Sequence, residues 1–383
     1  MPLSAYLAVI GAAAVVSFVS MPLLRSLSFK IGAVVQPDAR RVHTRPTALL
    51  GGAGMLAGFL TGMLVAWQID DFSPTFRTIT PPLGVALAAI AMYLIGQLDD
   101  LREVSPPAKL AGIVLSASIL SLAGVTILFF RIPFFGLFSL SPDLSAFVTV
   151  LWVAGMANAI NLIDGLDGLA AGIVAIAAAA FLLYAEHLNS IGVIDIGNVG
   201  PLVAACVLGT CLGYLPWNVH PAKIFMGDAG ALLLGLLMAA ATIAVGGNTP
   251  PDVQASGQAF FFFAPLFLPL VILGVPILDT AWAILRRASS RSGVSIADKG
   301  HLHHRLMRLG HGQRLSVLIL WIWTALLSAL VLFPAYTGRG DAVVPIGIAA
   351  VVLVLYTMFA PGLRARRHNG DDAPAERSMS GRA

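Results

Sequence analysis

Asparagine and aspartate recur at every third position of one stretch in an otherwise apolar chain: Asn158, Asn161, Asp164 and Asp167. Residues three apart are neighbours on a helix, so these side chains would gather on one side. Gly165 and Gly168 weaken a helix here and predict a kink or a short break. An Asp at the centre of a membrane helix costs about 2.5–3.5 kcal/mol, so the stretch favours a cation or polar-substrate site. The alternative is an acidic loop between two spans, although Gly and Asn alone would form a cheaper one.

A second acidic pair, Asp99 and Asp100, stands where another apolar run ends. Adjacent carboxylates repel each other and a helix C-terminus disfavours acids, so a divalent cation or a shared proton would relieve them. The alternative is a helix end that meets water. Lys109 either neutralises phosphate or extends to the membrane surface. Asp228, flanked by glycines, precedes a further apolar run and predicts either an N-cap or a phosphate site at a helix N-terminus.

Basic side chains form two further motifs. The segment Arg40–Gly52 contains His43 and Arg45 and ends in Gly51-Gly52, which lets another backbone approach closely. Its charge would meet a negatively charged substrate, unless it is ordinary cytoplasmic positive charge. The other motif comprises His301, His303, His304 and Arg305. Three histidines suggest zinc, but no cysteine lies nearby and basic neighbours crowd them, so a diphosphate suits this motif better.

The composition is that of an integral membrane protein. Hydrophobic residues make up 58% of the 383 residues and charged residues only 11%, whereas soluble domains have about 25% charged residues. Apolar runs of about 20 residues recur along the chain and predict membrane-spanning helices, the first of them retained rather than cleaved. Cys206 and Cys211 lie inside one such run, which favours core packing over a disulfide or a metal site.

Eleven spans are predicted. They cover about Leu3–Leu24, Leu49–Trp67, Pro82–Leu98, Lys109–Leu122, Leu144–Ile163, Leu169–Tyr184, Val199–Leu215, Ala229–Val245, Phe260–Leu285, Leu315–Phe333 and Val343–Ala360. If successive loops lie on opposite sides of the membrane, every Lys and Arg except Arg77, Arg131 and Arg339 falls on the same side. The positive-inside rule makes that side cytoplasmic, with the N-terminus outside and the C-terminus inside.

The predicted fold class is therefore an all-α polytopic membrane protein, with a single transmembrane catalytic domain over residues 1–363 and a disordered cytoplasmic tail over 364–383. Three prolines predict a bent or broken helix near 260–285. Alternating apolar residues predict a small outer hairpin near 124–141. The polar motifs fall in predicted cytoplasmic loops at about 25–48, 99–108, 158–168, 216–228 and 286–314.

Acids suited to Mg²⁺, basic groups suited to phosphate and a hydrophobic surround on one membrane face indicate phosphoryl transfer at a membrane interface. The sequence has no Walker loop, dinucleotide-binding glycine pattern or kinase signature, so another device binds the phosphate. A cation-coupled transporter is the alternative from a different class, but it would place its acids near the middle of the membrane. Nothing points to nucleic acid.

In this order the motifs resemble those of the polyprenyl-phosphate N-acetylhexosamine-1-phosphate transferase superfamily, glycosyltransferase family 4. The resemblance runs from about Arg40 to Arg314 and is most specific in Asn161–Ala170 together with Phe225–Asp228. It implies Mg²⁺-dependent transfer of a HexNAc 1-phosphate, first of all GlcNAc 1-phosphate, from a UDP-sugar to membrane polyprenyl phosphate. UMP is the second product, and the step would begin a cell-envelope glycan such as lipopolysaccharide or teichoic acid. The alternative within the superfamily is the phospho-MurNAc-pentapeptide transferase branch of peptidoglycan synthesis.

The resemblance also implies residue roles by motif position. The catalytic acids would be Asp99, Asp100, Asp164 and Asp167, with one of the first two as the base that deprotonates the lipid phosphate. Mg²⁺, with Mn²⁺ as a substitute, would be held by Asp228, Asp100 and Asn161. The substrates would be bound by His301, His303, His304, Arg305, Lys109, His43, Arg45 and Asn158. The expected setting is a bacterial inner membrane with the active site facing the cytoplasm, and a homodimer is the expected assembly.

Overall fold

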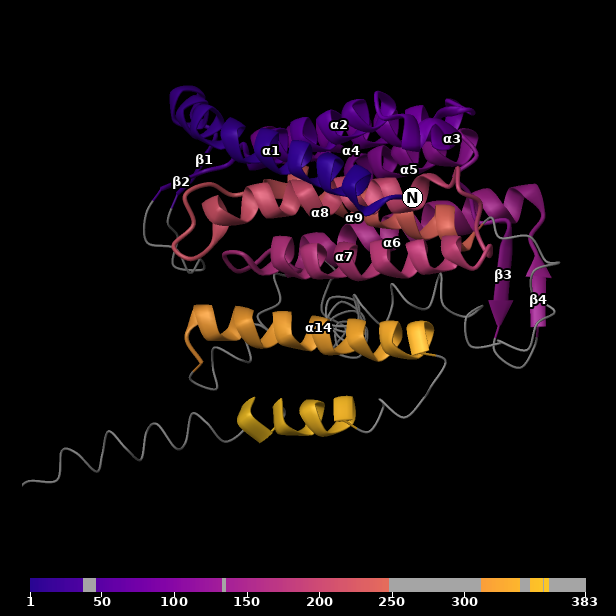
Figure 1. The fold of residues 1–383 in the computed structure, drawn as a ribbon. Helices are drawn as coiled ribbons and strands as arrows, with labels where there is room; N and C mark the ends of the chain where they lie inside the picture. The colour runs from indigo at the N-terminus through magenta and orange to yellow at the C-terminus, as the bar shows by residue number, and fades with distance from the viewer. Residues whose placement is uncertain (37–45, 133–135, 248–310, 338–344, 354, 358–383) are drawn as a thin grey trace, which may run out of the picture.

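Long apolar segments of the chain fold as helices that lie side by side in a bundle (Figure 1). The computed structural model describes residues 1–36, 46–132, 136–247, 311–337, 345–353 and 355–357. Two antiparallel strand pairs lie at opposite ends of the helices (Figure 1). The pairs are β1 (Val34–Val35) with β2 (Thr47–Ala48), and β3 (Phe129–Ile132) with β4 (Gly136–Ser139). The second pair confirms the hairpin predicted near 124–141.

The helices coincide with the predicted spans wherever the structure describes them. They are α1 (Leu3–Ile31), α2 (Gly51–Trp67), α4 (Thr80–Arg102), α5 (Pro106–Leu122), α6 (Pro142–Ile163), α7 (Leu169–Ser190), α8 (Val199–Asn218), α9 (Gly227–Gly246) and α14 (Gln313–Thr337). Short helices η1 (Asp70–Phe72) and α3 (Ser73–Phe76) follow α2, and Pro345–Thr357 forms a further short apolar helix. The bent span predicted near 260–285 lies outside the described residues.

Seven of the described helices are long and apolar enough to cross a membrane, or eight if α2 and the short helices after it, bent by 92°, form one span. The chain is therefore a mostly helical polytopic membrane protein. The count of eleven spans, the sides on which the termini lie, the domain limit at residue 363 and the disordered tail stay predictions.

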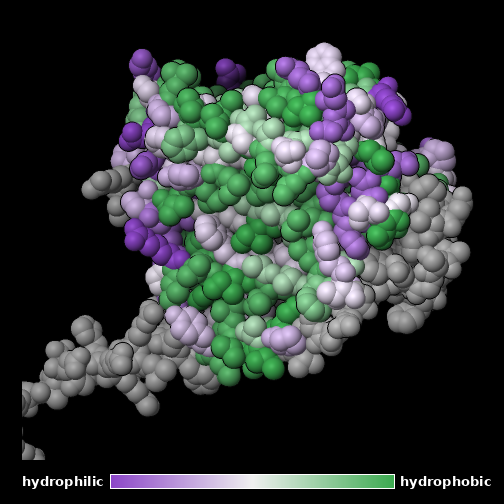
Figure 2. All heavy atoms as spheres, viewed as in Figure 1, coloured by the Kyte–Doolittle hydropathy of each residue, from purple (hydrophilic) through white to green (hydrophobic). Residues whose placement is uncertain are grey.

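Large apolar side chains are exposed on the outside of the bundle. Leu23 of α1 is 71% exposed and Leu122 of α5 is 87% exposed. Figure 2 shows hydrophobic side chains over the middle of one face, while hydrophilic ones gather towards its left and right margins. Because exposed apolar surface costs about 25 cal/mol per Å² in water, this distribution fits a hydrocarbon surround across the middle of the helices.

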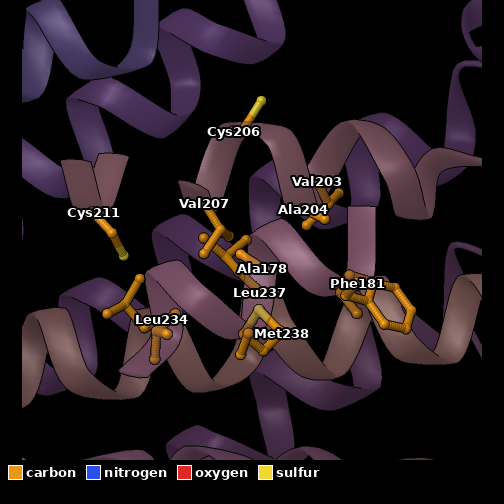
Figure 3. Packing of buried hydrophobic residues seen from close by; sticks show 14 of the residues in the cluster. Ala178, Phe181, Val203, Ala204, Cys206, Val207, Cys211, Leu234, Leu237 and Met238 are labelled. Atoms are coloured by element: carbon orange, nitrogen blue, oxygen red, sulfur yellow. The ribbon is translucent and has the colours of Figure 1, made fainter. Parts of the chain in front are cut away.

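The core is built around α9, which packs against α4, α6 and α8. Buried side chains of α7, α8 and α9 interdigitate in Figure 3, among them Phe181, Val207 and Met238. Cys206 and Cys211 of α8 are both buried and free, which confirms that they pack in the core. The centre of the bundle thus depends on helices with many small residues, which allow close packing.

Gly96 brings α4 unusually close to the start of α9. A Cβ atom at position 96 would lie 2.5 Å from the Cα of Ala229 and 2.7 Å from the backbone oxygen of Asp228. Real Cβ atoms do not approach other atoms this closely, so only glycine fits without movement of one helix. This contact sets the distance between the polar ends of the two helices.

We therefore expect Gly96→Ala to destabilise the protein by about 1–3 kcal/mol, as overpacked core substitutions do. The matched control is Gly155→Ala in α6, where a Cβ would meet nothing within 4 Å and where alanine should raise helix propensity. The measurement is the thermal unfolding midpoint of both variants in detergent. A midpoint for Gly96→Ala equal to that of the control would contradict this packing.

Candidate active site

Several helix ends meet at the end of the bundle that carries β1 and β2 (Figure 1), and the polar contacts of the site lie there. There α4 ends, α5 begins, α6 gives way to α7, and α9 begins. Because α4 continues to Arg102, Asp99 and Asp100 lie in its last turn and not in a loop over 99–108. The paired acids therefore sit on a rigid element rather than on a connecting segment.

Asp100 accepts hydrogen bonds from the first backbone N–H groups of α9. Its Oδ1 lies 2.8 Å from the nitrogen of Asp228, and its Oδ2 lies 3.0 Å from the nitrogen of Ala229. Gly227 has a φ of +66°, and a side chain there would collide with the Asp100 carboxylate. Asp100, rather than Asp228, thus satisfies the open N-terminus of α9, and its charge faces the positive end of the helix dipole.

Lys109, in the first turn of α5, bridges Asp99 and Asp228. Its Nζ lies 2.8 Å from Oδ2 of Asp99 and also donates to Oδ2 of Asp228. Oδ1 of Asp99 accepts a hydrogen bond of 2.8 Å from the N–H of Val104. The three bridged side chains are only 16–31% exposed, so water screens them less than an open surface pair. The bridge joins three residues from separate sequence motifs, and it engages the Lys109 charge that was predicted for phosphate.

The break predicted at Gly165 and Gly168 is confirmed, because no helix covers residues 164–168 and Gly168 has a φ of +78°. Asp164 follows the last residue of α6 as its C-cap. The gap between α6 and α7 places Asp164 and Asp167 in a non-helical turn at the site, so their carboxylates are not fixed on the surface of a helix.

The two asparagines of this stretch lie within α6 and have different surroundings. The Asn161 side chain interacts with the Asp228 carboxylate, so it relates the end of α6 to the start of α9. Asn158 is exposed, and its Nδ2 donates a bond of 2.7 Å to the backbone oxygen of Ala154 in the same helix. The structure therefore brings Asn161, but not Asn158, to the acidic cluster.

Asp167 holds the segment between α8 and α9. Its Oδ2 lies 2.7 Å from Nδ1 of His220 and accepts a hydrogen bond of 3.1 Å from the N–H of Ala222. Asn218 reinforces this link, because its Oδ1 accepts from the N–H of Gly168 at 2.9 Å and its Nδ2 donates to the backbone oxygen of Ile224 at 3.1 Å. Asp167 therefore organises the segment that leads to Asp228, and its catalytic role stays a prediction.

The segment before α9 is also pinned to the segment before α2. The N–H of Gly51 donates to the oxygen of Phe225 at 2.9 Å, and the N–H of Gly52 donates to the oxygen of Met226 at 3.1 Å. Cβ atoms at these glycines would lie 2.5 Å from the Phe225 oxygen and 2.6 Å from the Gly230 nitrogen. The close backbone approach predicted for Gly51-Gly52 is therefore confirmed.

The carboxyl group of Asp164 is held in a strongly negative environment. Burial is the largest cause that raises its pKa to about 7, and the negative charges of Asp228, Asp100 and Asp167 add to it. A carboxyl group so disposed attracts either a proton or a cation at neutral pH. Negative charge at this end of the bundle is therefore only partly neutralised by Lys109.

The donor set of this cluster is suitable for Mg²⁺, which prefers carboxylate and amide oxygens. Within the part of the chain that the structure describes, however, no three His, Cys, Asp or Glu side chains are arranged to hold a metal ion. The Lys109 ammonium lies between Asp99 and Asp228, and both oxygens of Asp100 accept backbone N–H groups. The residues fit the ion by their chemistry, and Lys109 would have to move from the carboxylates to admit it.

Six predicted substrate-binding residues lie outside the described residues. They are His43, Arg45, His301, His303, His304 and Arg305. His311, which follows that motif, is described and buried, and its Nε2 lies 2.9 Å from the backbone oxygen of Thr357. His311 therefore attaches the start of α14 to the C-terminal helix.

Two residues of the site were absent from the predicted set: Asn218 and His220. Asn218 is the last residue of α8 and His220 follows it shortly before Asp228, where polar residues interrupt an apolar chain. Their position in a predicted loop on the same side as the other motifs is the sequence feature that would have identified Asn218 and His220.

Comparison with known proteins places the chain among sugar-phosphate transferases. The model of the family described as glycosyl transferase family 4 matches residues 82–246. A decaprenyl-phosphate N-acetylglucosaminephosphotransferase of Mycolicibacterium smegmatis is 34% identical over 356 residues, which cover 92% of this chain and 88% of that protein.

Two further relatives mark the breadth of the similarity. A probable undecaprenyl-phosphate N-acetylglucosaminyl 1-phosphate transferase of Bacillus subtilis is 34% identical over 79% of this chain and 77% of its own length. A phospho-N-acetylmuramoyl-pentapeptide-transferase of Desulforamulus reducens is 30% identical over 83% of this chain and 90% of its own. Similarity thus extends to both branches but covers more of the chain in the mycobacterial relative.

The raised pKa of Asp164 predicts how stability depends on pH. Between the ordinary Asp pKa of about 4 and a pH of about 7, the folded protein holds a proton that the unfolded chain has lost. The contribution of Asp164 is therefore fully present below pH ~4 and is lost as pH rises through about 7. We expect Asp164→Asn to flatten this loss and to unfold at a higher temperature than the original protein at pH 8.

The measurement is the thermal unfolding midpoint from pH 5 to 8.5 in detergent with EDTA. Asp143→Asn is the matched control, because Asp143 is exposed in the first turn of α6 at the β3–β4 end. Its pH dependence should follow that of the original protein. Identical slopes for Asp164→Asn and the original protein would refute the assignment.

Proposed function

The chain belongs to glycosyl transferase family 4, and from this premise we propose that it transfers GlcNAc 1-phosphate from UDP-GlcNAc to a membrane polyprenyl phosphate and releases UMP. The observation that carries the proposal is the cluster of Asp99, Lys109 and Asp228 at one end of an apolar bundle. A charged site at a membrane surface is what a soluble nucleotide sugar and a lipid phosphate both need. Relatives with printed names of this activity, 34% identical over most of the chain, support the same choice.

In the proposed reaction, an oxygen of the polyprenyl phosphate attacks the β-phosphorus of the UDP-sugar. The new O–P bond forms as the bond between the β-phosphorus and the UMP oxygen breaks, and UMP leaves. Such a reaction needs positioning and charge neutralisation more than covalent chemistry by the protein. Lys109 supplies a cation at the centre of the cluster, and Asp99 at the end of α4 and Asp228 at the start of α9 orient it. Either Asp99 or Asp100 would act as the base, and each would first release a partner, because both oxygens of Asp99 and both oxygens of Asp100 accept hydrogen bonds.

We further propose Mg²⁺ as the cofactor, with Mn²⁺ as a substitute. Asp228 and Asn161 would hold it, and Asp100 would contribute through the remaining lone pairs of its oxygens. When bound, the ion would neutralise the diphosphate and stabilise the departing UMP. The raised pKa of Asp164 supports a cation here, since it reports unbalanced negative charge at the same place.

The predicted roles of the remaining motifs belong to the same proposal. His301, His303, His304 and Arg305 would hold the diphosphate or the sugar, and His43 and Arg45 would meet a phosphate group. The distribution of Lys and Arg supports an active site that faces the cytoplasm of a bacterial inner membrane. A homodimer is the proposed assembly.

Two other functions remain to be tested against this one. Transfer of phospho-MurNAc-pentapeptide rests on a more distant relative with that name, which is 30% identical. A cation-coupled transporter is disfavoured, because the acids lie at helix ends rather than near the middle of the helices.

The first test is release of UMP by purified protein with undecaprenyl phosphate and Mg²⁺. UDP-GlcNAc, UDP-GalNAc and UDP-MurNAc-pentapeptide are offered separately, and EDTA serves as the control. We expect UMP from UDP-GlcNAc and none in EDTA. UMP from the pentapeptide donor alone would move the protein to the other branch, and UMP from none of them would refute the proposal.

A second test concerns Asp228. We expect Asp228→Asn to lower the rate of UMP release at least ~100-fold. The substitution removes the negative charge that pairs with Lys109, lies next to Asn161 and would bind the proposed ion. The unfolding midpoint should stay near that of the original protein, and Asp143→Asn should keep full activity. Retained Mg²⁺-dependent transfer in Asp228→Asn would exclude it as a metal ligand.

A further inference from the structure

His220 lies beside the acidic cluster, and no role proposed above uses it. Its Nδ1 is 2.7 Å from Oδ2 of Asp167, whose side chain is only 10% exposed, whereas the His220 side chain is 36% exposed. A nearly buried carboxylate therefore holds one ring nitrogen of an imidazole whose side chain is partly exposed among the described residues. Because an ionised carboxylate only accepts hydrogen bonds, Nδ1 carries the proton and Nε2 becomes the outward hydrogen-bonding atom.

The ring is one of several groups that hold the segment between α8 and α9, because backbone and other side-chain bonds also do so. Asn218 bonds Gly168 and Ile224, and the Tyr214 hydroxyl donates to the Ile224 oxygen at 3.1 Å. The N–H of Phe225 donates to the oxygen of Ala48 at 2.8 Å. A ring that is oriented by Asp167 and partly exposed is available for a ligand.

A second basic group stands next to it. Arg314, at the start of α14, donates from its guanidinium to the backbone oxygen of His220 at 3.1 Å. Lys109, in contrast, is engaged by two carboxylates. His220 and Arg314 thus form a basic pair from two separate elements at the margin of an acidic site.

We propose that Nε2 of His220, with Arg314 beside it, binds a phosphate group of one of the two substrates, and that Asp167 orients the ring for this contact. The inference rests on the proposed function and adds a substrate-binding residue to it. Nε2 can serve in either protonation state, as a donor to a phosphate oxygen or as an acceptor from a protonated phosphate. The phosphate belongs either to the UDP-sugar or to the polyprenyl phosphate, and the test separates the two.

The test is protection of His220 from diethyl pyrocarbonate in the unmodified full-length protein, followed by peptide mass spectrometry. The reagent acylates exposed imidazole nitrogens, so His220 should react when no substrate is present. We expect saturating UDP-GlcNAc or saturating polyprenyl phosphate, added separately, to slow labelling of His220 at least ~5-fold. Protection by the first alone assigns the contact to the donor, and protection by the second alone assigns it to the acceptor.

His187 is the internal control, because it lies in the last turn of α7, at the opposite end from Gly168. Its labelling should not change with either substrate. Unchanged labelling of His220 in protein that releases UMP would overturn this inference and leave the proposed function intact. Protein that releases no UMP from any donor would instead refute the proposed function.

A variant separates binding from positioning. In His220→Asn, the amide nitrogen can occupy the place of Nδ1 and keep the bond to Asp167, but nothing replaces Nε2. We expect an unchanged unfolding midpoint and a kcat/KM at least ~10-fold lower for the substrate that protects His220, whereas His187→Asn should match the original protein. Full activity in His220→Asn would show that the ring only positions the segment, and would overturn the inference.

Discussion

The site depends on the contact between the Asp100 carboxylate and the first N–H groups of α9. Asp99 and Asp100 lie at the end of α4, where the dipole of their own helix disfavours negative charge. The N-terminus of α9 compensates Asp100, and Lys109 compensates Asp99. Hydrogen bonds to charged groups contribute about 1.5–3 kcal/mol each, so this junction offsets an arrangement that would otherwise be unfavourable. Gly96 and Gly227 permit it, because a side chain at either position would separate the two helices.

Local features of the fold were predictable from the sequence. Hydropathy predicts the helices from α1 to α9, because each apolar segment must satisfy its backbone within itself in lipid. The glycines at 165 and 168 predict the break after α6, and alternation predicts the β3–β4 pair. Position in the sequence also predicts that Asp99, Asp164 and Asp228 lie on one side of the membrane. Asp99 and Asp164 follow spans that run towards the predicted cytoplasmic side, and Asp228 precedes a span that starts there.

Partners between distant segments were not predictable in the same way. Asp100 accepts hydrogen bonds from the backbone of α9, whereas Asp228 pairs with Lys109. This choice of partners depends on the distance between α4 and α9, which no periodicity in the sequence encodes. Asp167 was predicted to be catalytic, yet its oxygen is occupied by His220 and Ala222 across a gap of more than fifty residues. Asn158 has the same spacing as Asn161 but donates to the backbone of its own helix, because it lies about one turn further from the end of α6 where the acids gather.

The burial of α9 has a consequence for biosynthesis. Most of this helix, 94% of its apolar window, is enclosed by other parts of the chain, yet ribosomes produce it after all the helices from α1 to α8. Helices α1 to α8 must therefore enter the membrane first and leave space at their centre for α9. Until α9 is in place, Asp100 has no backbone groups to accept from and Lys109 has only Asp99 as a partner. The insertion of α9 thus fills the centre of the helices made before it and supplies the partners of Asp100 and Lys109 in a single event.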